Sequence, residues 1–359
     1  MRTSIVLGTR PEIIKMSPII RECERLRLDY FILHTGQHYS YNMNRVFFDQ
    51  LELPEAKYDL GVGSGSHAEQ TGKMLVGIEK VLREETPDIV LVEGDTNTVL
   101  AAALAAVKLG IMVGHVEAGL RCYDRKMPEE INRILVDHCS DYLFAPTEKS
   151  KQNLLNEGIP QERAFVTGNT IVDAVLRNLE IADRRVNVLN KLGLDDGEYF
   201  VATIHRQENV DDERRLRGIA KGLERVRREF KMELVYPVHP RTRKRLRTLG
   251  LNLNDVTLVQ PLDYLSFLQL EKHSKLVLTD SGGVQEEACI LGVPCVTLRD
   301  STERPETLDV GSNSLAGITY KRIVQKVKLM LTKRSGWKNP FGDGKAGRMI
   351  IRVLRRELD

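Results

Sequence analysis

Short runs of isoleucine, valine and leucine alternate along the chain with longer segments of helical periodicity. In the first half, six apolar runs predict β-strands, at residues 4–8, 30–34, 88–94, 111–117, 142–147 and 164–168. Amphipathic segments such as residues 67–85 and 128–141 predict helices between them. Continuous apolar strands that alternate with helices are typical of parallel sheets covered on both faces. The pattern therefore predicts β-α-β units.

The second half repeats this scheme. Five further strands are predicted, at residues 199–205, 233–239, 256–260, 275–280 and 294–298, with helices near 212–230, 240–248, 263–273 and 283–291. We predict an α/β protein with two Rossmann-like, doubly wound domains that face a central cleft. Their expected extents are residues 1–170 and 171–344, with the polar segment 183–198 as the crossover between the halves. The amphipathic helix predicted at 345–359 should pack back on the first domain.

Composition narrows the class of protein. At 359 residues the chain is long enough for two domains, and its 42% of apolar residues suffices for a core in each. The net charge of +3 is too small to indicate nucleic-acid or membrane binding. The five cysteines are odd in number and lack C-x-x-C spacing, so neither a disulfide framework nor a zinc site is expected. With no signal peptide at the first strand, we expect a cytoplasmic protein.

Polar clusters follow six of the predicted strands directly. Their sequences are "GTRPE", "EGDTNT", "HVEAGLR", "IHRQEN", "VHPRTR" and "TDSGGVQEEA". Solubility alone explains one such loop, but it is a poor explanation of six that mix Asp, Glu, His and Arg. The carboxyl ends of parallel strands lie at one edge of the sheet, where α/β proteins bind ligands. These loops are therefore the candidate site.

The cluster "TDSGGVQEEA" has the features of a phosphate site. Ser281 can cap a helix, and Gly282 and Gly283 leave its first amide groups accessible to an anion. Glu286 and Glu287 follow about one turn later, where a carboxylate can accept hydrogen bonds from ribose hydroxyls. The alternative is a tight turn with an exposed acidic face.

Two histidines end equivalent strands of the second half. His205 precedes Arg206, and His239 lies two residues before Arg241. Such pairs can stabilise a pyrophosphate leaving group or transfer protons. His34 and His38 have i,i+4 spacing without an H-E-x-x-H motif, and "GVGSGSH" at 61–67 lacks the third glycine of a dinucleotide fingerprint. Neither a metal nor a nicotinamide cofactor is expected, and the basic run 241–247 is read as a solvated helix face.

In order along the chain, "GTRPEIIKMSP", "GDTNT", "GHVEAGLR", "PEEINR", "HRQEN", "DSGGVQEEA", "GVP" and "TERPE" resemble the non-hydrolysing UDP-N-acetylglucosamine 2-epimerase family. The resemblance covers nearly the whole chain. It implies a glycosyltransferase-B-like fold, a homodimer, no cofactor, and interconversion of UDP-GlcNAc and UDP-ManNAc, which serves polysaccharide biosynthesis. In this family UDP is eliminated across C1–C2 to give 2-acetamidoglucal and is then re-added.

The resemblance also implies roles for individual residues. The carboxylates of Asp95, Glu117 and Glu129 take the acid and base roles, with Glu129 chosen over Glu130 because it is the first glutamate after proline. His205 acts in catalysis or on the leaving group. The implied substrate-binding residues are Arg10, Lys15, His239, Ser281, Gly282, Gly283, Glu287 and Arg304.

An activator site for a second UDP-GlcNAc is implied at Gln37 and His38, although Ser40 stands where the family has a further glutamine. The loop 122–127 is also shorter than in bacterial members. Four alternatives stay open: a hydrolysing relative, an epimerase of a UDP-diacetamido-uronic acid, a glycosyltransferase of the same fold, and a UDP-sugar-binding regulatory protein without turnover.

Overall fold

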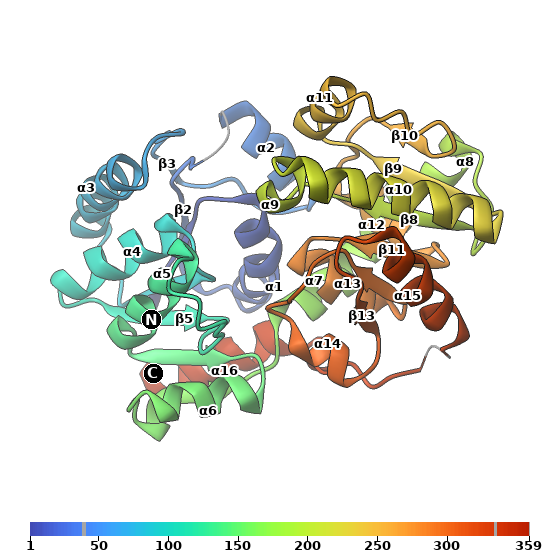
Figure 1. The fold of residues 1–359 in the computed structure, drawn as a ribbon. Helices are drawn as coiled ribbons and strands as arrows, with labels where there is room; N and C mark the ends of the chain where they lie inside the picture. The colour runs from blue at the N-terminus through green and yellow to red at the C-terminus, as the bar shows by residue number, and fades with distance from the viewer. Residues whose placement is uncertain (38–40, 334–335, 359) are drawn as a thin grey trace. The chain divides into compact units, whose positions relative to one another are not determined.

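The computed structural model describes residues 1–37, 41–333 and 336–358, and divides into two compact units (Figure 1). The first comprises Met1–Leu176 and Phe341–Asp359, and the second comprises Arg177–Pro340. The boundaries expected at 170 and 344 differ by a few residues. The reason is that the helix α7 (Thr170–Arg185) continues through the first boundary, so its periodicity hides the change of unit.

The first unit is built on a parallel sheet whose seven strands, within the described residues, follow the order β3-β2-β1-β4-β5-β6-β7. Their bounds are β1 Arg2–Leu7, β2 Asp29–His34, β3 Tyr58–Asp59, β4 Ile89–Glu93, β5 Met112–Val116, β6 Tyr142–Ala145 and β7 Ala164–Val166. The six predicted strands of this half are confirmed. The sequence analysis missed β3, because two residues at a sheet edge carry no detectable periodicity.

Helices cover this sheet and connect its strands. They are α1 Arg10–Leu26, α2 Tyr41–Gln50, α3 His67–Glu85, α4 Asn97–Lys108, α5 Pro128–Cys139 and α6 Glu148–Asn156, with a 3-10 turn at Gln161–Arg163, then α7, and α16 Ala346–Leu358 near the end of the chain. The carboxylate of Asp173 in α7 accepts hydrogen bonds from the first amides of α16, Ala346 N at 3.1 Å and Gly347 N at 3.0 Å. An added Cβ on Gly347 would lie 2.9 Å from Pro18, so α16 packs closely on α1.

The second unit has a parallel sheet of six strands in its described part, in the order β10-β9-β8-β11-β12-β13. The strands are β8 Tyr199–Thr203, β9 Glu233–Pro237, β10 Thr257–Val259, β11 Leu276–Thr279, β12 Cys295–Thr297 and β13 Asn313–Leu315. The five predicted strands are confirmed, and the short edge strand β13 was missed. The helices are α8 Val188–Leu192, α9 Gln207–Val210, α10 Glu213–Phe230, α11 Pro240–Thr248, α12 Tyr264–Lys272, α13 Gly282–Leu291, α14 Pro305–Asp309 and α15 Tyr320–Thr332.

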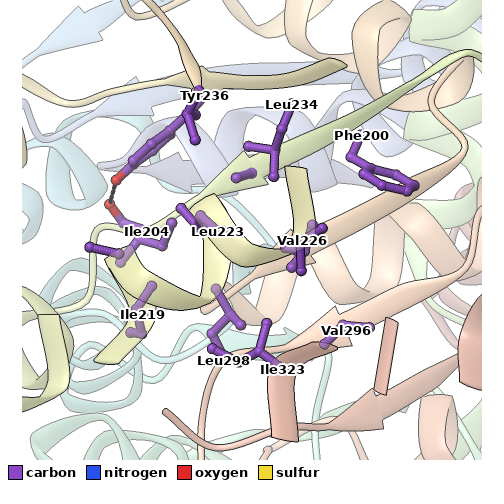
Figure 2. Packing of buried hydrophobic residues seen from close by; sticks show 14 of the residues in the cluster. Phe200, Ile204, Ile219, Leu223, Val226, Leu234, Tyr236, Val296, Leu298 and Ile323 are labelled. Atoms are coloured by element: carbon purple, nitrogen blue, oxygen red, sulfur yellow. Dashed lines mark hydrogen bonds between the residues drawn. The ribbon is translucent and has the colours of Figure 1, made fainter. Parts of the chain in front are cut away.

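Apolar side chains of this second sheet pack against α10 and α15 (Figure 2). Phe200, Leu234 and Val296 come from three strands, and Leu223 and Ile323 come from the two helices. All five are at most 1% exposed. Burial of each such side chain contributes about 1.5–3 kcal/mol. This core fixes the strands whose carboxyl ends carry the second unit's polar loops.

Both sheets reverse their strand order once. In the first sheet the reversal lies between β1 and β4, and in the second between β8 and β11. Adjacent loops at such a switch point run in opposite directions and open a crevice, where doubly wound proteins bind ligands. The polar loops that begin at Gly8, Gly94, His205 and Asp280 follow these four strands.

No helix in the part of the chain that the structure describes is long and apolar enough to cross a membrane.

Candidate functional site

Asp95 lies at the switch point of the first unit, in the loop between β4 and α4. The guanidinium of Arg133, on α5, donates to Asp95 Oδ2 from Nη2 at 2.8 Å and from Nε at 3.2 Å. The neighbouring Asn132 donates from Nδ2 to the Asp95 carbonyl at 2.9 Å. One face of α5 thus holds the side chain and the backbone of Asp95. About a third of the Asp95 side chain stays exposed.

Glu117 follows β5 and is 7% exposed. Its backbone has φ of 68°, a left-handed conformation that costs a non-glycine residue free energy and occurs often at functional sites. The Lys15 ammonium, on α1, forms an ion pair with Glu117 Oε2. Two residues predicted from the family resemblance are therefore in direct contact, although 102 positions separate them.

Glu93 is a residue of this site that the sequence analysis did not select. It is the last residue of β4, is 2% exposed, and places Oε1 3.3 Å from Lys15 Nζ. Burial is the largest influence on Glu93 and raises its pKa well above the usual range. Lys15 opposes this rise, and Glu117 adds to it. In the sequence, Glu93 is recognisable only as an acidic residue at the end of a continuous apolar run.

Arg121, in the loop after β5, is paired with acidic side chains of the same unit. Arg121 contacts the carboxylates of Asp137 and Glu157, each at 2.7 Å. His115 Nδ1 lies 2.6 Å from Asp137, and its Nε2 lies 2.8 Å from the carbonyl oxygen of Gly94. Burial would raise the pKa of Asp137, but His115 and Arg121 outweigh it and lower that pKa. This buried network ties the Asp95 loop to α5.

The two glutamates at the start of α5 have different environments. Glu130 is fully buried, pairs with Arg133, and accepts hydrogen bonds from the backbone amides of Cys122 and Tyr123. Glu129 is exposed in the first helical turn. Glu130 therefore shapes the loop, while the Glu129 carboxylate is exposed. The catalytic role expected of Glu129 stays a prediction.

The remaining predicted residues of this unit lie around the first loop. Arg10, at the start of α1, stacks its guanidinium on the Phe47 ring at 5.4 Å. Gln37 is buried, and its side-chain oxygen accepts a hydrogen bond from Thr98 at 2.8 Å. His38 lies outside the described residues.

In the second unit, Asp280 organises the loop after β8 and was also missed by the sequence analysis. It is fully buried and accepts hydrogen bonds from the amides of His205 and Arg206, each at 3.1 Å, and from Asn209 Nδ2 at 3.0 Å. The His205 ring is about half exposed, with Nδ1 3.4 Å from Asp280. Partial burial is the largest influence and lowers the pKa of His205. Asp280 opposes this shift, and Arg206 and His239 support it.

The start of α13 has the geometry expected of an anion site. Ser281 caps the helix by accepting from Val284 N at 3.5 Å. A Cβ on Gly282 would lie 2.5 Å from Glu303 Oε1, whereas the nearest atom to one on Gly283 is 4.0 Å away. Only glycine fits the first position without displacing Glu303, and Gly283 leaves the helix end open. His239 is exposed and caps the neighbouring helix α11.

Charged side chains surround this helix end. Glu303 pairs with Arg206 and Arg299. Arg304 Nε lies 2.8 Å from Glu286. Glu287, the predicted ribose ligand, is 7% exposed and accepts from the Tyr264 hydroxyl at 3.0 Å. The second-unit residues predicted to bind substrate lie in the segments that follow its strands. They are His239 at the start of α11, Ser281, Gly282 and Gly283 at the start of α13, Glu287 in the second turn of α13, and Arg304 at the start of α14.

Among the described residues, no cluster of three or more His, Cys, Asp or Glu side chains is arranged to hold a metal ion.

Comparison with known proteins identifies the family. The family model described as UDP-N-acetylglucosamine 2-epimerase matches residues 21–355. The chain belongs to the UDP-N-acetylglucosamine 2-epimerase family. The family resemblance stated from the sequence motifs is confirmed, and with it the assignment to an isomerase family.

Members of this epimerase family match over the full chain. A UDP-N-acetylglucosamine 2-epimerase of Methanocaldococcus jannaschii is 56% identical over 99% of both chains. The crystal structure of the M. jannaschii UDP-GlcNAc 2-epimerase with UDP-GlcNAc and UDP has a TM-score of 0.91, at 55% identity, over 99% of this chain and 100% of that one. A UDP-2,3-diacetamido-2,3-dideoxy-D-glucuronate 2-epimerase of Pseudomonas aeruginosa is 41% identical over 99% of this chain and all of its own.

A glycosyltransferase structure from Rickettsia africae shares the fold alone, at 12% identity and a TM-score of 0.59 over 100% of this chain and 99% of that one. The predicted glycosyltransferase-B-like fold of the epimerase family is confirmed.

Proposed function

We propose that this protein interconverts UDP-GlcNAc and UDP-ManNAc without hydrolysis, by eliminating UDP to 2-acetamidoglucal and adding it back. The observation that carries the proposal is the full-length similarity to an epimerase solved with UDP-GlcNAc and UDP, at 55% identity. Two features of this chain support the proposal. Acidic side chains gather at the switch point of the first sheet, and a helix start suited to an anion lies at the switch point of the second sheet.

The second unit would hold the nucleotide. The free amides at the start of α13, beside Gly283, suit the pyrophosphate. Glu287 is placed to accept hydrogen bonds from ribose hydroxyls, and His205, His239 and Arg304 add donors for the departing UDP. Stabilising the charge that develops on a leaving group is often the largest single contribution to catalysis.

The first unit would carry the proton transfers. The C2 proton of the sugar is not acidic, so its removal must accompany departure of UDP from C1. One carboxylate of Asp95, Glu117 and Glu129 takes this proton, and a carboxylic acid on the opposite face of the glucal returns one as UDP adds again. Arg133 holds Asp95 and Lys15 holds Glu117, so that each carboxylate keeps its orientation through the cycle.

Further predictions about the protein are proposals of the same kind. The homodimer and an activator site at Gln37 and His38 rest on the family resemblance, and the cytoplasmic location rests on the sequence pattern alone. Initial rates that rise linearly with low concentrations of UDP-GlcNAc, rather than sigmoidally, would contradict the activator site.

The test of the proposed function is proton and phosphorus NMR of UDP-GlcNAc with the purified full-length protein in D2O. Deuterium at C2 together with intact UDP-ManNAc is the expected result. Free UDP with ManNAc would assign the protein to the hydrolysing branch. An unchanged spectrum would refute the proposal for UDP-GlcNAc, and the same assay on the UDP-diacetamido-uronic acid would then test that alternative.

Single substitutions test the acid and base roles. Asp95→Asn and Glu117→Gln should each lower kcat by about 100-fold or more, because general acid–base catalysis typically contributes 10²–10⁴-fold. UDP affinity, measured by calorimetry, should stay within a few-fold of wild type. Glu79→Gln is the control, since Glu79 forms an exposed pair with Arg83 on α3 and should leave both quantities unchanged. Equal loss of UDP binding and turnover would instead indicate a structural role for these carboxylates.

A further inference from the structure

Three ionisable side chains, one basic and two acidic, meet at the carboxyl ends of β4 and β5. Lys15 contacts both Glu93 and Glu117, and the three side chains are 12%, 3% and 4% exposed, respectively. One ammonium therefore faces two carboxyl groups at a position that excludes most water. An uncompensated buried charge costs several kcal/mol, so one carboxyl group in such a cluster takes up a proton.

The hydrogen bonds show which carboxyl group holds the proton. Glu117 receives the ammonium of Lys15 within hydrogen-bond distance. Glu93 Oε1 accepts no hydrogen bond from a described residue, although it lies 3.3 Å from Lys15 Nζ. The neighbouring Glu117 carboxylate raises the pKa of Glu93, because two carboxyl groups so close to each other share a proton more readily than both ionise. Glu117 is thus the better compensated anion and Glu93 the neutral acid.

The other groups around Glu93 do not remove this imbalance. Glu12 approaches from α1 and adds negative charge, and it already accepts from Thr96 and from the amide of Gly8. His115, on β5, directs its ring to Asp137 and to the Gly94 carbonyl rather than to Glu93.

We propose that Glu93 is a positioning residue: it stays protonated and donates its carboxyl proton to Glu117, which Lys15 and Glu93 together hold in its left-handed backbone conformation. The proposal deepens the proposed function and rests on it for its catalytic consequence. Two donors from different elements fix the carboxylate whose orientation decides the proton transfer. A displacement of about 1 Å at such a group can cost about 100-fold in rate.

Two substitutions separate donation by Glu93 from mere filling of space. In Glu93→Gln the amide donates to Glu117 as the acid does, and kcat near pH 7 should stay within about tenfold of wild type. Glu93→Leu keeps the volume but removes the donor, and kcat should fall by about 100-fold while KM for UDP-GlcNAc changes little. Equal losses of kcat in the two variants would overturn the proposal.

The pH profile is a readout that a purely structural role would not change. In the wild type, kcat should fall on the alkaline side as Glu93 ionises and places a second negative charge beside Glu117. Glutamine cannot ionise, so the alkaline limb of Glu93→Gln should move to higher pH or disappear. An alkaline limb identical to that of the wild type would contradict the proposal.

A stability measurement tests the proton without any turnover. The pKa of Glu93 is raised in the folded protein, so the folded state keeps a proton that the unfolded chain releases. The wild type therefore loses stability as pH rises from the ordinary glutamate value through the folded pKa, whereas Glu93→Gln does not. The Tm of Glu93→Gln minus that of the wild type should increase by about 3 °C or more between pH 5 and 8.

Glu85→Gln is the matched control in the same unit. Its partner Lys57, followed by Tyr58, lowers the pKa of Glu85, so its contribution changes only at lower pH and the Tm difference should be constant from pH 5 to 8. A constant difference for Glu93→Gln as well would show that Glu93 is ionised, and would overturn the inference. A wild type inert toward UDP-GlcNAc in D2O would refute the proposed function, while the stability series would still decide the protonation of Glu93.

Discussion

The charge cluster around Glu303 makes the stability of the second unit depend on pH. The Glu303 side chain is 14% exposed and pairs with Arg206 and Arg299. Burial would raise its pKa, but Arg206, Arg299 and Arg304 outweigh burial and lower the pKa of Glu303 from 4.5 to about 2. A depressed carboxyl pKa stabilises the folded state above the unfolded pKa, and this contribution is lost as pH falls through the folded pKa.

Glu303→Gln replaces the carboxylate by a neutral amide, which mimics the protonated acid. A shift of about 2.5 pKa units corresponds to about 3 kcal/mol, so the free energy of unfolding of the second unit should fall by about this amount near pH 7. The difference between wild type and variant should then shrink by about 1.4 kcal/mol when the pH is lowered to about 3.5. Urea unfolding at a series of pH values, followed by circular dichroism, measures both quantities.

The control is Glu208→Gln, which removes a partner of the same arginine from an exposed position. Glu208 Oε1 lies 3.1 Å from Arg299 Nε, but half of its side chain is in solvent. Exposed ion pairs contribute about 0–1 kcal/mol, so little change is expected. If the difference in stability between wild type and Glu303→Gln stays the same from pH 7 to 3.5, the arginines do not lower the pKa of Glu303 and this account is wrong.

Three further substitutions test the packing of the first unit. Gly119→Ala should destabilise the protein by about 2–4 kcal/mol, because φ is 79° and the new Cβ would lie 2.2 Å from the Ser150 carbonyl oxygen. Gly72→Ala in α3, where a Cβ meets nothing within 4 Å, should instead stabilise it by about 0.5–1 kcal/mol, and equal effects in urea unfolding would contradict the steric argument. Asp137→Asn should cost about 3–5 kcal/mol, because it leaves the buried His115 and Arg121 without their common carboxylate, and a loss below about 1 kcal/mol would count against that role.

The candidate site was predictable wherever the signal was local. The strand exits at Gly8, Gly94 and His205 follow from apolar runs that end in polar residues, and those ends agree with the structure within a few residues. Helix starts at Ser281 and Pro128 follow from capping residues and proline, whose effects extend over one turn.

The residues that were missed have no local signal. In the sequence, Glu93 looks like the end of any buried strand, and only the fold places Lys15 of α1 beside it. Asp280 looks like a turn residue, and only the fold directs the amides of the loop after β8 to its carboxylate. The short edge strands β3 and β13 form because their neighbours offer unpaired backbone groups, which a pattern within two or three residues cannot reveal.

The order of strands and helices, the loops that carry the chemistry and the family all follow from the sequence, because side-chain periodicity, helix capping and ordered motifs are local signals. Which charges meet depends on the packing of elements far apart in the chain. Lys15 contacts Glu117 and Glu93, and Arg133 on α5 contacts Asp95, across separations of 38 to 102 positions. Such pairings depend on long-range packing of whole elements, and the protonation of Glu93 depends in turn on the burial that this packing creates.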